Sequence, residues 1–298
     1  MVHVVTLISA PGAPALDDAV LAKIAKLLAA TEKPRWLAPG IAADLSFTPD
    51  GGIDPSTAAD RVRGALPGLA LDVVVQPSAR RRKQLLVADM DSTMIGQECV
   101  DELADKVGLK SRIAAITERA MRGDIAFEPA LRERVALLKG LPLPVIDQVL
   151  AERIHARPGA RTLVRTMRAH GAYTCLVSGG FTLFTGPVAA MIGFEEHRAN
   201  RLIVEAGRIA GVVEPILGRD AKRAALIELA ERLGLEREDT LAVGDGANDL
   251  AMLEAAGLGV AYRAKPKVAA SARARIDHGD LDALLYLQGY RREEFAAG

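Results

Sequence analysis

The stretch Leu85-Leu86-Val87-Ala88-Asp89-Met90-Asp91-Ser92-Thr93 places two carboxylates, two residues apart, directly after an apolar run. The run is typical of a buried strand, and Asp and Ser are typical of the loop that follows a strand. While the strand lasts, its period of two aims both carboxylates the same way. Open α/β sheets bind ligands just outside the carboxyl ends of their strands. The stretch therefore fits a nucleophile beside an acid or base, although alone it also fits an ordinary turn.

Further motifs recur downstream in the same local context. Residues 173–177 form an apolar run that ends in SGG at 178–180, and residues 241–243 form another that ends in GDGAND at 244–249. Between them, Lys222 lies near the start of a helical pattern. Because a parallel sheet brings the carboxyl ends of its strands to one edge, we expect the carboxylates and the serine hydroxyl to meet there.

This order of motifs resembles that of the haloacid dehalogenase-type phosphohydrolases, which carry the four motifs around an aspartyl-phosphate chemistry. The match extends over about residues 84–290, and the motifs are far more specific as an ordered set than singly. The resemblance implies an α/β fold in which a Rossmann-like parallel sheet forms the core and a helical cap is inserted. We assign residues 80–298 to this phosphatase domain.

The segment after the first motif is predicted to be helical. Apolar residues recur at three-four spacing in four stretches between residues 98 and 153, and glycine and proline separate them. We expect these helices to form the cap, at about residues 97–156. A cap suits phosphoryl transfer because it closes the site against unproductive chemistry. Residues 201–213 are predicted to form a hairpin around the turn at 206–207.

Residues 1–79 are predicted to form a separate α+β unit. Its order β-α-β-β-α-β fits a ferredoxin-like split and resembles, weakly, the amino-acid-binding ACT domains. We favour an ACT-like domain that stabilises the protein or forms a homodimer over a live regulatory site. The basic run at residues 80–83 is interpreted as part of a solvated linker rather than a nucleic-acid patch, because no aromatic residues interleave it.

Composition excludes several classes of partner. Lys plus Arg equals Asp plus Glu, at 38 each, so no global field attracts nucleic acid or anionic membranes. Cys99 and Cys175 form no C-x-x-C motif and are expected to be free thiols in a reducing compartment. The five histidines show no paired ligand spacing, so a zinc site is not expected. The N-terminus lacks the features of a signal peptide, and no apolar stretch approaches the roughly 18–20 residues of a membrane helix. We expect a soluble, cytoplasmic protein.

The resemblance assigns chemical roles to the motif residues. Asp89 corresponds to the nucleophile that becomes a phosphoaspartate. Asp91 would protonate the leaving alkoxide and then activate water, so we expect a raised pKa beside its carboxylate neighbours. Ser178 and the Gly179 amide would bind the phosphoryl oxygens, and Lys222 would neutralise their charge. An exposed lysine is the ordinary alternative for Lys222.

The same resemblance implies a magnesium site. Phosphate and carboxylates together concentrate negative charge, and Mg²⁺ prefers oxygen ligands. Asp89 and Asp245 would bind the metal through their side chains and Asp91 through its backbone carbonyl, with Asp249 supporting them. Turn or helix N-cap chemistry is the alternative role for Asp245 and Asp249, and it is compatible with metal binding.

The cap segment at residues 120–135 closely resembles that of the phosphoserine phosphatases. Glu98 matches the residue that pairs with the substrate ammonium, and Arg134 matches the one that binds its carboxylate. Met121 and Phe127 would form an apolar wall. Exposed cap-helix charges are the alternative for Glu98 and Arg134. The residues expected to bind substrate are Glu98, Met121, Phe127, Arg134, Ser178, Gly179, Gly180, Lys222 and Asn248.

The resemblance therefore implies Mg²⁺-dependent hydrolysis of O-phospho-L-serine to L-serine and phosphate, the last step of L-serine synthesis. A phosphotransferase that passes the phosphoryl group to homoserine, or a phosphatase for another small phosphate, would share these motifs. An amino-acid-sensing protein with a vestigial phosphatase half is disfavoured because all the motifs are intact. A receiver-like signalling protein also uses an acceptor Asp, but it would need neither Asp91 nor a cap.

Overall fold

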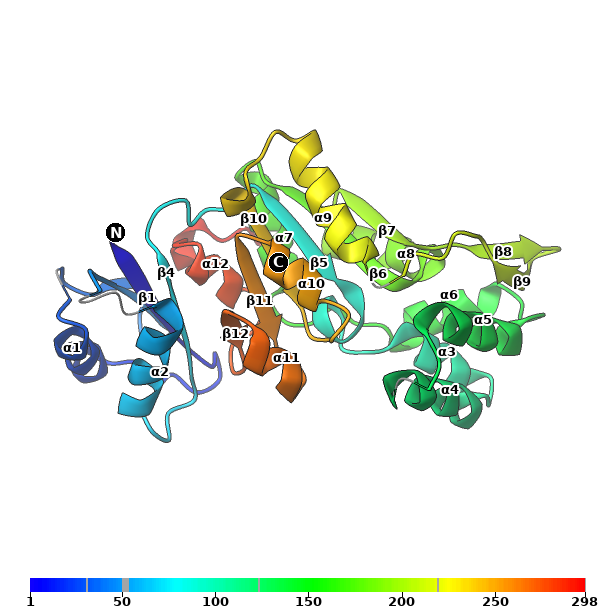
Figure 1. The fold of residues 1–298 in the computed structure, drawn as a ribbon, viewed down its shortest axis with the longest axis horizontal. Helices are drawn as coiled ribbons and strands as arrows, with labels where there is room; N and C mark the ends of the chain where they lie inside the picture. Colours follow the sequence, from blue (N-terminus) through cyan, green and yellow to red (C-terminus); the bar gives the residue numbers. More distant parts are fainter. Residues whose placement is uncertain (31, 50–53, 123, 219, 298) are drawn as a thin grey trace.

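The computed structural model describes residues 1–298 except residues 31, 50–53, 123, 219 and 298. The molecule is elongated. The N-terminal sheet lies at one end, a parallel sheet in the middle and a helical cap at the other end (Figure 1). In the part of the chain that is described, every helix is too short or too polar to cross a membrane.

The central sheet confirms the predicted parallel core. Its strands run in the order β12-β11-β10-β5-β6-β7, and every neighbouring pair is parallel. The apolar runs of the central strands β5 and β10 are buried on both faces, as in other parallel sheets. The strands are β5 (Leu85–Asp89), β6 (Tyr173–Phe181), β7 (Glu196–Asn200), β10 (Thr240–Gly244), β11 (Leu258–Tyr262) and β12 (Ala274–Ile276).

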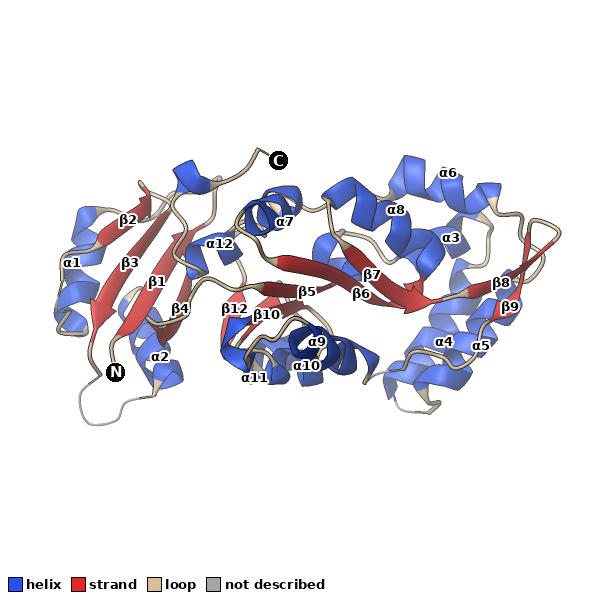
Figure 2. Ribbon diagram, turned by 90° about the horizontal axis from the view of Figure 1, so that it is seen from above, coloured by secondary structure: helices blue, strands red, loops and turns tan. Residues whose placement is uncertain are grey.

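Helices cover both faces of this sheet (Figure 2). Leu86 and Ala88 of β5 pack in the hydrophobic cluster on one face, and Leu85 and Val87 pack in the cluster on the other. One face is covered by α7 (Ala160–Ala169), α8 (Thr182–Ile192) and α12 (Ala283–Leu287), and the other by α9 (Ala221–Arg232), α10 (Leu250–Ala255) and α11 (Pro266–Ser271). Alternation along β5 thus anchors the strand that carries Asp89 from both sides.

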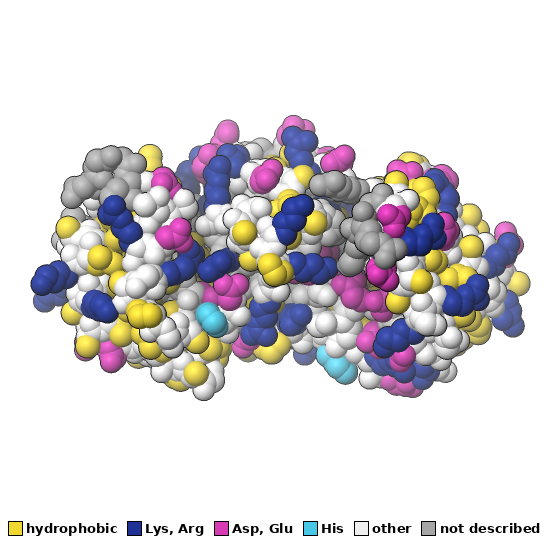
Figure 3. Space-filling view, turned by 60° about the horizontal axis from the view of Figure 1, so that its bottom comes forward, with side chains coloured by type: hydrophobic (Ala, Val, Ile, Leu, Met, Phe, Trp, Pro, Cys, Tyr) yellow, Lys and Arg dark blue, Asp and Glu magenta, His cyan; other side chains and the backbone are white. Residues whose placement is uncertain are grey.

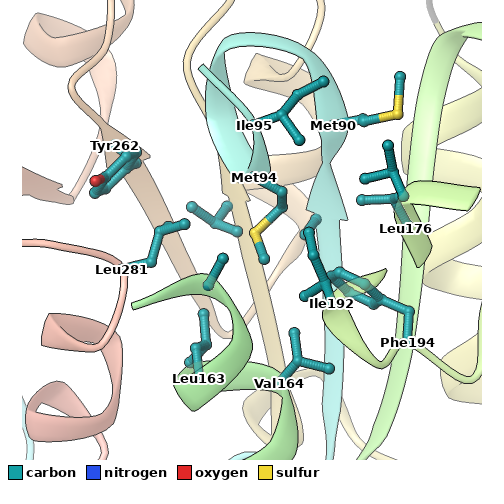
Figure 4. Close-up of a cluster of buried hydrophobic side chains, with 14 of the residues drawn as sticks. Met90, Met94, Ile95, Leu163, Val164, Leu176, Ile192, Phe194, Tyr262 and Leu281 are labelled. Carbon is teal, nitrogen blue, oxygen red and sulfur yellow. The ribbon is translucent and has the colours of Figure 1, made fainter. Parts of the chain in front are cut away.

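The turn that follows β5 is anchored by apolar side chains. Met90, Met94 and Ile95 are fully buried and pack with Leu163 of α7 and Leu176 of β6 (Figure 4). This packing holds the backbone on both sides of Asp91, so the carboxylate is presented from a rigid segment.

The predicted cap helices are present between β5 and α7. They are α3 (Cys99–Lys106), α4 (Lys110–Arg122), α5 (Phe127–Leu138) and α6 (Pro144–Arg153). The predicted hairpin is also present, as β8 (Leu202–Glu205) and β9 (Arg208–Val212). It lies against the cap, since the Gly140 N–H donates to the Ile209 carbonyl at 2.8 Å and the Ile209 N–H donates to the Leu141 carbonyl at 2.9 Å. The hairpin, which follows β7 of the core sheet in the sequence, therefore adds to the cap.

The N-terminal elements follow the predicted order β-α-β-β-α-β. The sheet order is β2-β3-β1-β4 with antiparallel pairs, and one face packs on α1 and α2. The elements are β1 (His3–Ser9), α1 (Asp18–Leu27), β2 (Arg35–Ala38), β3 (Ala42–Phe47), α2 (Pro55–Ala65) and β4 (Leu71–Pro77).

The other face of this sheet docks on the core through buried polar groups. Asp72 is 3 % exposed, and its carboxylate accepts backbone N–H bonds from Asp277 and Gly279, both at 2.7 Å. Gln76 donates to the Leu287 carbonyl at 2.7 Å. Because buried carboxylates need hydrogen-bond partners, this face is built to be covered by the core.

The prediction of a solvated linker at residues 80–83 is wrong for Arg81 and Lys83, whereas Arg80 and Arg82 are exposed. Arg80 forms an ion pair with Asp239 at 2.5 Å, and Arg81 donates to both oxygens of Asp44 at 2.7 and 3.0 Å. Lys83 is buried and donates to two backbone carbonyls. The basic run therefore joins the N-terminal sheet to the core. Its acidic partners lie 37 and 159 residues away, so charge patterning along the sequence could not identify them.

Candidate active site

A cavity of about 1220 Å³ lies between the carboxyl ends of the core strands and the cap. Figure 3 shows Asp and Glu side chains gathered in the hollow between the middle of the molecule and the cap. The predicted site residues that line the cavity are Asp89, Asp91, Glu98, Phe127, Arg134, Ser178, Gly179, Gly180, Asp245 and Asn248. The side chain of Met121 lies outside the part of the structure that is described, so its predicted place in the apolar wall stays a prediction.

A buried acidic cluster forms one wall of the cavity. Asp89 ends β5, Asp245 follows β10, and Asp249 comes directly before α10. One carboxylate oxygen from each lies within 4.8 Å of the other two. Parallel pairing of β5 with β10 brings the first two carboxylates together, as the motif order predicts. An all-oxygen set of this kind can hold a hard divalent cation.

Lys222 is buried against this cluster rather than exposed. Its Nζ lies 2.6 Å from Asp89 Oδ1 and 2.7 Å from Asp249 Oδ1. Burial alone would lower the pKa of Lys222, but the two carboxylates outweigh burial and raise it. The ammonium therefore stays charged and offsets part of the negative charge around Asp89.

Asp249 and Asp245 are held in different ways. The oxygens of Asp249 accept from Lys222 Nζ at 2.7 Å and from the Gly246 N–H at 2.9 Å. Asp245 Oδ1 accepts from the Thr93 hydroxyl at 3.1 Å, and Asp245 also faces the cavity. This difference favours Asp245 as a metal ligand and Asp249 as a residue that fixes Lys222 and the loop.

Asp91 lies between the first motif and the SGG motif. Its Oδ1 accepts the Cys99 N–H at 2.9 Å, and its Oδ2 accepts the Ser178 hydroxyl at 3.2 Å. Burial raises the pKa of Asp91 against the opposing effect of these bonds. The direction agrees with the sequence-based expectation, but burial is its main cause and the neighbouring carboxylates are not. A proton held here at higher pH suits a general acid.

The cap side of the cavity carries charges of both signs. Glu98 accepts from the Ser92 hydroxyl at 2.7 Å, and burial, reinforced by the charge of Asp91, raises its pKa to about 7. Arg134 is partly buried on α5, and its Nε donates to the Ala130 carbonyl at 3.4 Å. One acidic and one basic group from the cap side therefore line the same cavity as the acidic cluster.

The apolar wall and the SGG motif are in close contact. Phe127 Cζ lies 3.3 Å from where a Cβ atom on Gly179 would be. A Cβ atom at Gly179 would therefore make the Phe127 ring shift by a few tenths of an ångström, so glycine suits both the ring and a phosphoryl group near the backbone.

Sequence reasoning missed some groups at this site. Asp101 lines the cavity one helical turn after Glu98, and helical spacing was a signal that could have found it. Thr93 lies two residues after Asp91 and holds Asp245. Lys265 lines the cavity, and its N–H donates to the Asp245 carbonyl at 3.2 Å. A lone lysine after a strand offers no comparable signal.

Residues 86–254 match the haloacid dehalogenase-like hydrolase family. The chain therefore belongs to this family. The order of its strand-end motifs and its buried lysine follows the motif order expected for the family. Its relatives include a phosphoserine phosphatase from Polaromonas sp., 44% identical over 227 residues that make up 74% of this chain and 96% of the relative. The phosphoserine phosphatase SerB2 of Mycobacterium tuberculosis is 44% identical over 230 residues, which make up 76% of this chain and 56% of the relative.

A solved structure described as a phospho-aspartyl intermediate analogue of phosphoserine phosphatase is also similar. Its TM-score is 0.63 and its identity 37%, over 69% of this chain and 98% of that chain. The present chain spans 56% and 60% of the length of the relatives from M. tuberculosis and Streptomyces coelicolor. Those relatives are thus substantially longer proteins.

Proposed function

We propose that this protein is a phosphoserine phosphatase, which hydrolyses O-phospho-L-serine to L-serine and phosphate in the last step of L-serine biosynthesis. The observation that carries the proposal is that one cavity holds two sets of groups. Asp89, Asp91 and Ser178 suit a phosphoryl group, while Glu98 and Arg134 suit an ammonium and a carboxylate. The names of the relatives support the same substrate.

The reaction would have two steps that share one acid and base. In the first, a carboxylate oxygen of Asp89 attacks phosphorus and the bond from phosphorus to the serine oxygen breaks, while Asp91 gives its proton to that oxygen. In the second, Asp91 takes a proton from water, which attacks phosphorus and releases phosphate and the Asp89 carboxylate. Ser178, with the Gly179 amide, would hold the phosphoryl oxygens, and Lys222 would offset their charge.

The acidic cluster would hold Mg²⁺. The carboxylates of Asp89 and Asp245 and the backbone carbonyl of Asp91 would be its protein ligands, and Asp249 would support them. When bound, the metal would neutralise phosphoryl charge. Among the described residues, Lys222 contacts Asp89 and Asp249, and Lys265 lies near Asp245. Two cations do not balance the carboxylates of the cluster and Asp91 together with a phosphate dianion, so further positive charge is needed before the phosphate can approach.

Substrate selection would depend on the cap. Arg134 would bind the carboxylate and Glu98 the ammonium, each through charge-assisted hydrogen bonds. Phe127 would exclude water from the reacting centre, and Asn248 would contact the substrate. These contacts lie outside the phosphoryl group, so they distinguish phosphoserine from other phosphate esters.

We also propose a division of the chain. Residues 1–79 would be an ACT-like domain, and residues 80–298 the phosphatase domain with the cap at about 97–156. A homodimer through the N-terminal domain and a cytoplasmic location stay predictions.

A substrate screen tests the proposal. Release of phosphate and serine from phosphoserine is measured with and without Mg²⁺, beside p-nitrophenyl phosphate and phosphoethanolamine. Phosphoserine should be the best substrate, and EDTA should abolish turnover. Phosphate transfer to added homoserine would instead indicate a phosphotransferase, and inactivity with every ester would favour a sensing role.

A variant of Asp89 tests the assignment of the nucleophile. Asp89→Asn should abolish turnover, and it should not form the hydroxylamine-sensitive acyl phosphate that the wild type forms. Normal turnover of this variant would refute Asp89 as nucleophile.

A further inference from the structure

Asn200 is a buried polar residue at the end of β7, behind the wall of the cavity. Its side chain is 2 % exposed and is not among the described residues that line the cavity. Its Nδ2 donates to the Gly179 carbonyl at 3.0 Å, and its Oδ1 accepts the Leu217 N–H at 2.6 Å. Nδ2 also lies 3.4 Å from the Leu217 carbonyl. One amide group therefore links the SGG motif to the segment before Lys222.

The bond to Gly179 fixes a peptide group that in turn orients Ser178. The carbonyl of the peptide between Gly179 and Gly180 accepts from Asn200, while its N–H donates to Ser178 Oγ at 2.9 Å. A hydroxyl oxygen has one proton to donate. With a lone pair of Oγ engaged by Gly180, that proton points away from the peptide, where it is donated to Asp91 Oδ2 at 3.2 Å or would turn to a phosphoryl oxygen. The orientation of the hydroxyl thus depends on the peptide plane that Asn200 holds.

The strand ladder does not fix this peptide from the β7 side. Pairing between β6 and β7 extends to Val177 and resumes only at Phe181, opposite Asn200 itself. The intervening SGG motif is left without regular partners on β7. Glycines also leave their backbone freer than other residues do. The Asn200 amide takes the place of the missing ladder contact.

The bonds to Leu217 reach a second segment of the cavity wall. Gly218 follows Leu217 and lines the cavity, as does Asp220, and α9 with Lys222 begins at Ala221. Asn200 therefore sets the distance between the SGG motif and the segment that leads to the lysine. The SGG motif and Lys222 would contact the same phosphoryl group.

We propose that Asn200 is a positioning residue for phosphoryl transfer, which holds the peptide plane behind Ser178 and ties it to the Lys222 segment. The inference rests on the proposed function for the identity of the substrate, but it concerns only the phosphoryl end of the site. A small displacement of such groups reduces the rate strongly, by up to roughly a hundredfold for 1 Å.

The test compares Asn200→Ala and Asn200→Asp with Thr174→Val. Thr174 is buried at the opposite end of β6, where its hydroxyl accepts the Glu195 N–H at 3.2 Å, so its loss weakens the same strand pair far from the cavity. Asn200→Asp keeps the acceptor for Leu217 but places an oxygen against the Gly179 carbonyl. Each variant is assayed with phosphoserine and p-nitrophenyl phosphate, and its Tm and its affinity for inorganic phosphate are measured.

We expect Asn200→Ala to lower kcat/KM for both esters by a similar factor, roughly tenfold to a hundredfold, and to weaken phosphate binding. Asn200→Asp should be impaired at least as much. Thr174→Val should lower Tm yet keep kcat/KM within about twofold of wild type. Wild-type kinetics in both Asn200 variants would overturn the inference. So would a loss of kcat/KM in Thr174→Val as large as that in the Asn200 variants at the same decrease in Tm. Failure of the wild type on phosphoserine alone would refute the proposed substrate and leave the comparison with p-nitrophenyl phosphate and phosphate binding intact.

Discussion

The ammonium of Lys222 lies 2.6 Å from Oδ1 of Asp89, and both side chains are buried. Asp249 accepts from the same ammonium at 2.7 Å. The ammonium of Lys222 is thus shared between Asp89, the proposed nucleophile, and the carboxylate of Asp249. Removing a partner from a buried ion pair leaves an uncompensated charge, whereas removing one from an exposed pair costs little.

Lys222→Met should therefore lower the free energy of unfolding by roughly 3–5 kcal/mol in EDTA, measured by urea denaturation. Millimolar Mg²⁺ should restore part of the loss, because a bound cation replaces some of the missing charge. The control is Lys106→Met, which removes an exposed ion pair with Glu152 and should cost less than about 1 kcal/mol. Equal small losses of stability in both variants would show that the charge of Lys222 is not needed to stabilise Asp89 and Asp249.

Asp91→Asn should lower kcat for phosphoserine by roughly 10²–10⁴-fold, because the amide cannot transfer a proton but leaves the backbone carbonyl in place. p-Nitrophenol is a good leaving group and needs little protonation. The burst of p-nitrophenol in rapid-mixing experiments should therefore be less affected than the burst of serine from phosphoserine. If both bursts fall by the same factor, Asp91 supports the structure rather than transferring protons.

Arg134→Ala should reduce kcat/KM for phosphoserine roughly tenfold to a hundredfold more than for p-nitrophenyl phosphate, which has no carboxylate. Phosphoethanolamine also lacks the carboxylate, so it should be a poor wild-type substrate and lose little further. The matched control is Arg132→Ala on the same helix, whose side chain pairs with Glu214 at 2.8 Å and does not line the cavity in the described residues. A uniform loss for all substrates in Arg134→Ala would assign it to cap packing or closure.

Glu98 should make substrate preference depend on pH. Its pKa is raised to about 7, so the carboxylate that would bind the substrate ammonium is lost as the pH falls below 7 and is present above it. The ratio of kcat/KM for phosphoserine to that for p-nitrophenyl phosphate should therefore rise between about pH 6 and pH 8. Taking the ratio cancels ionisations of the phosphoryl side that both esters share. Glu98→Gln should make the ratio low and independent of pH; an unchanged profile in this variant would exclude Glu98.

Asp72→Ala should destabilise the whole protein by roughly 1–3 kcal/mol or more, because backbone N–H groups of the core lose their acceptor in a buried interface. Asp60→Ala is the control, since Asp60 is exposed and pairs with Arg63 within α2. Unfolding curves from tryptophan fluorescence, which reports on Trp36 in the N-terminal sheet, and from activity should shift together in Asp72→Ala. A separate early transition of the fluorescence alone would mean that the N-terminal unit unfolds independently.

Local patterns were sufficient to predict most of the fold. Apolar runs that end in Asp89, Ser178 and Asp245 indicated parallel strands, and the parallel arrangement brought those residues to one edge. Three-four spacing predicted the cap helices. These predictions succeeded because each depends on residues a few positions apart, and because strand ends of a parallel sheet necessarily lie together.

The sequence by itself thus determined the parallel core, the inserted cap and the set of groups at the sheet edge. Only the tertiary structure decided what those groups touch. The burial that raises the pKa of Asp91, the salt bridge from Arg81 to Asp44 and the amide of Asn200 behind Gly179 all depend on elements distant in the chain. Hydrogen bonds and desolvation act over a few ångströms of space, and nothing in the order of residues states which distant groups will come within that range.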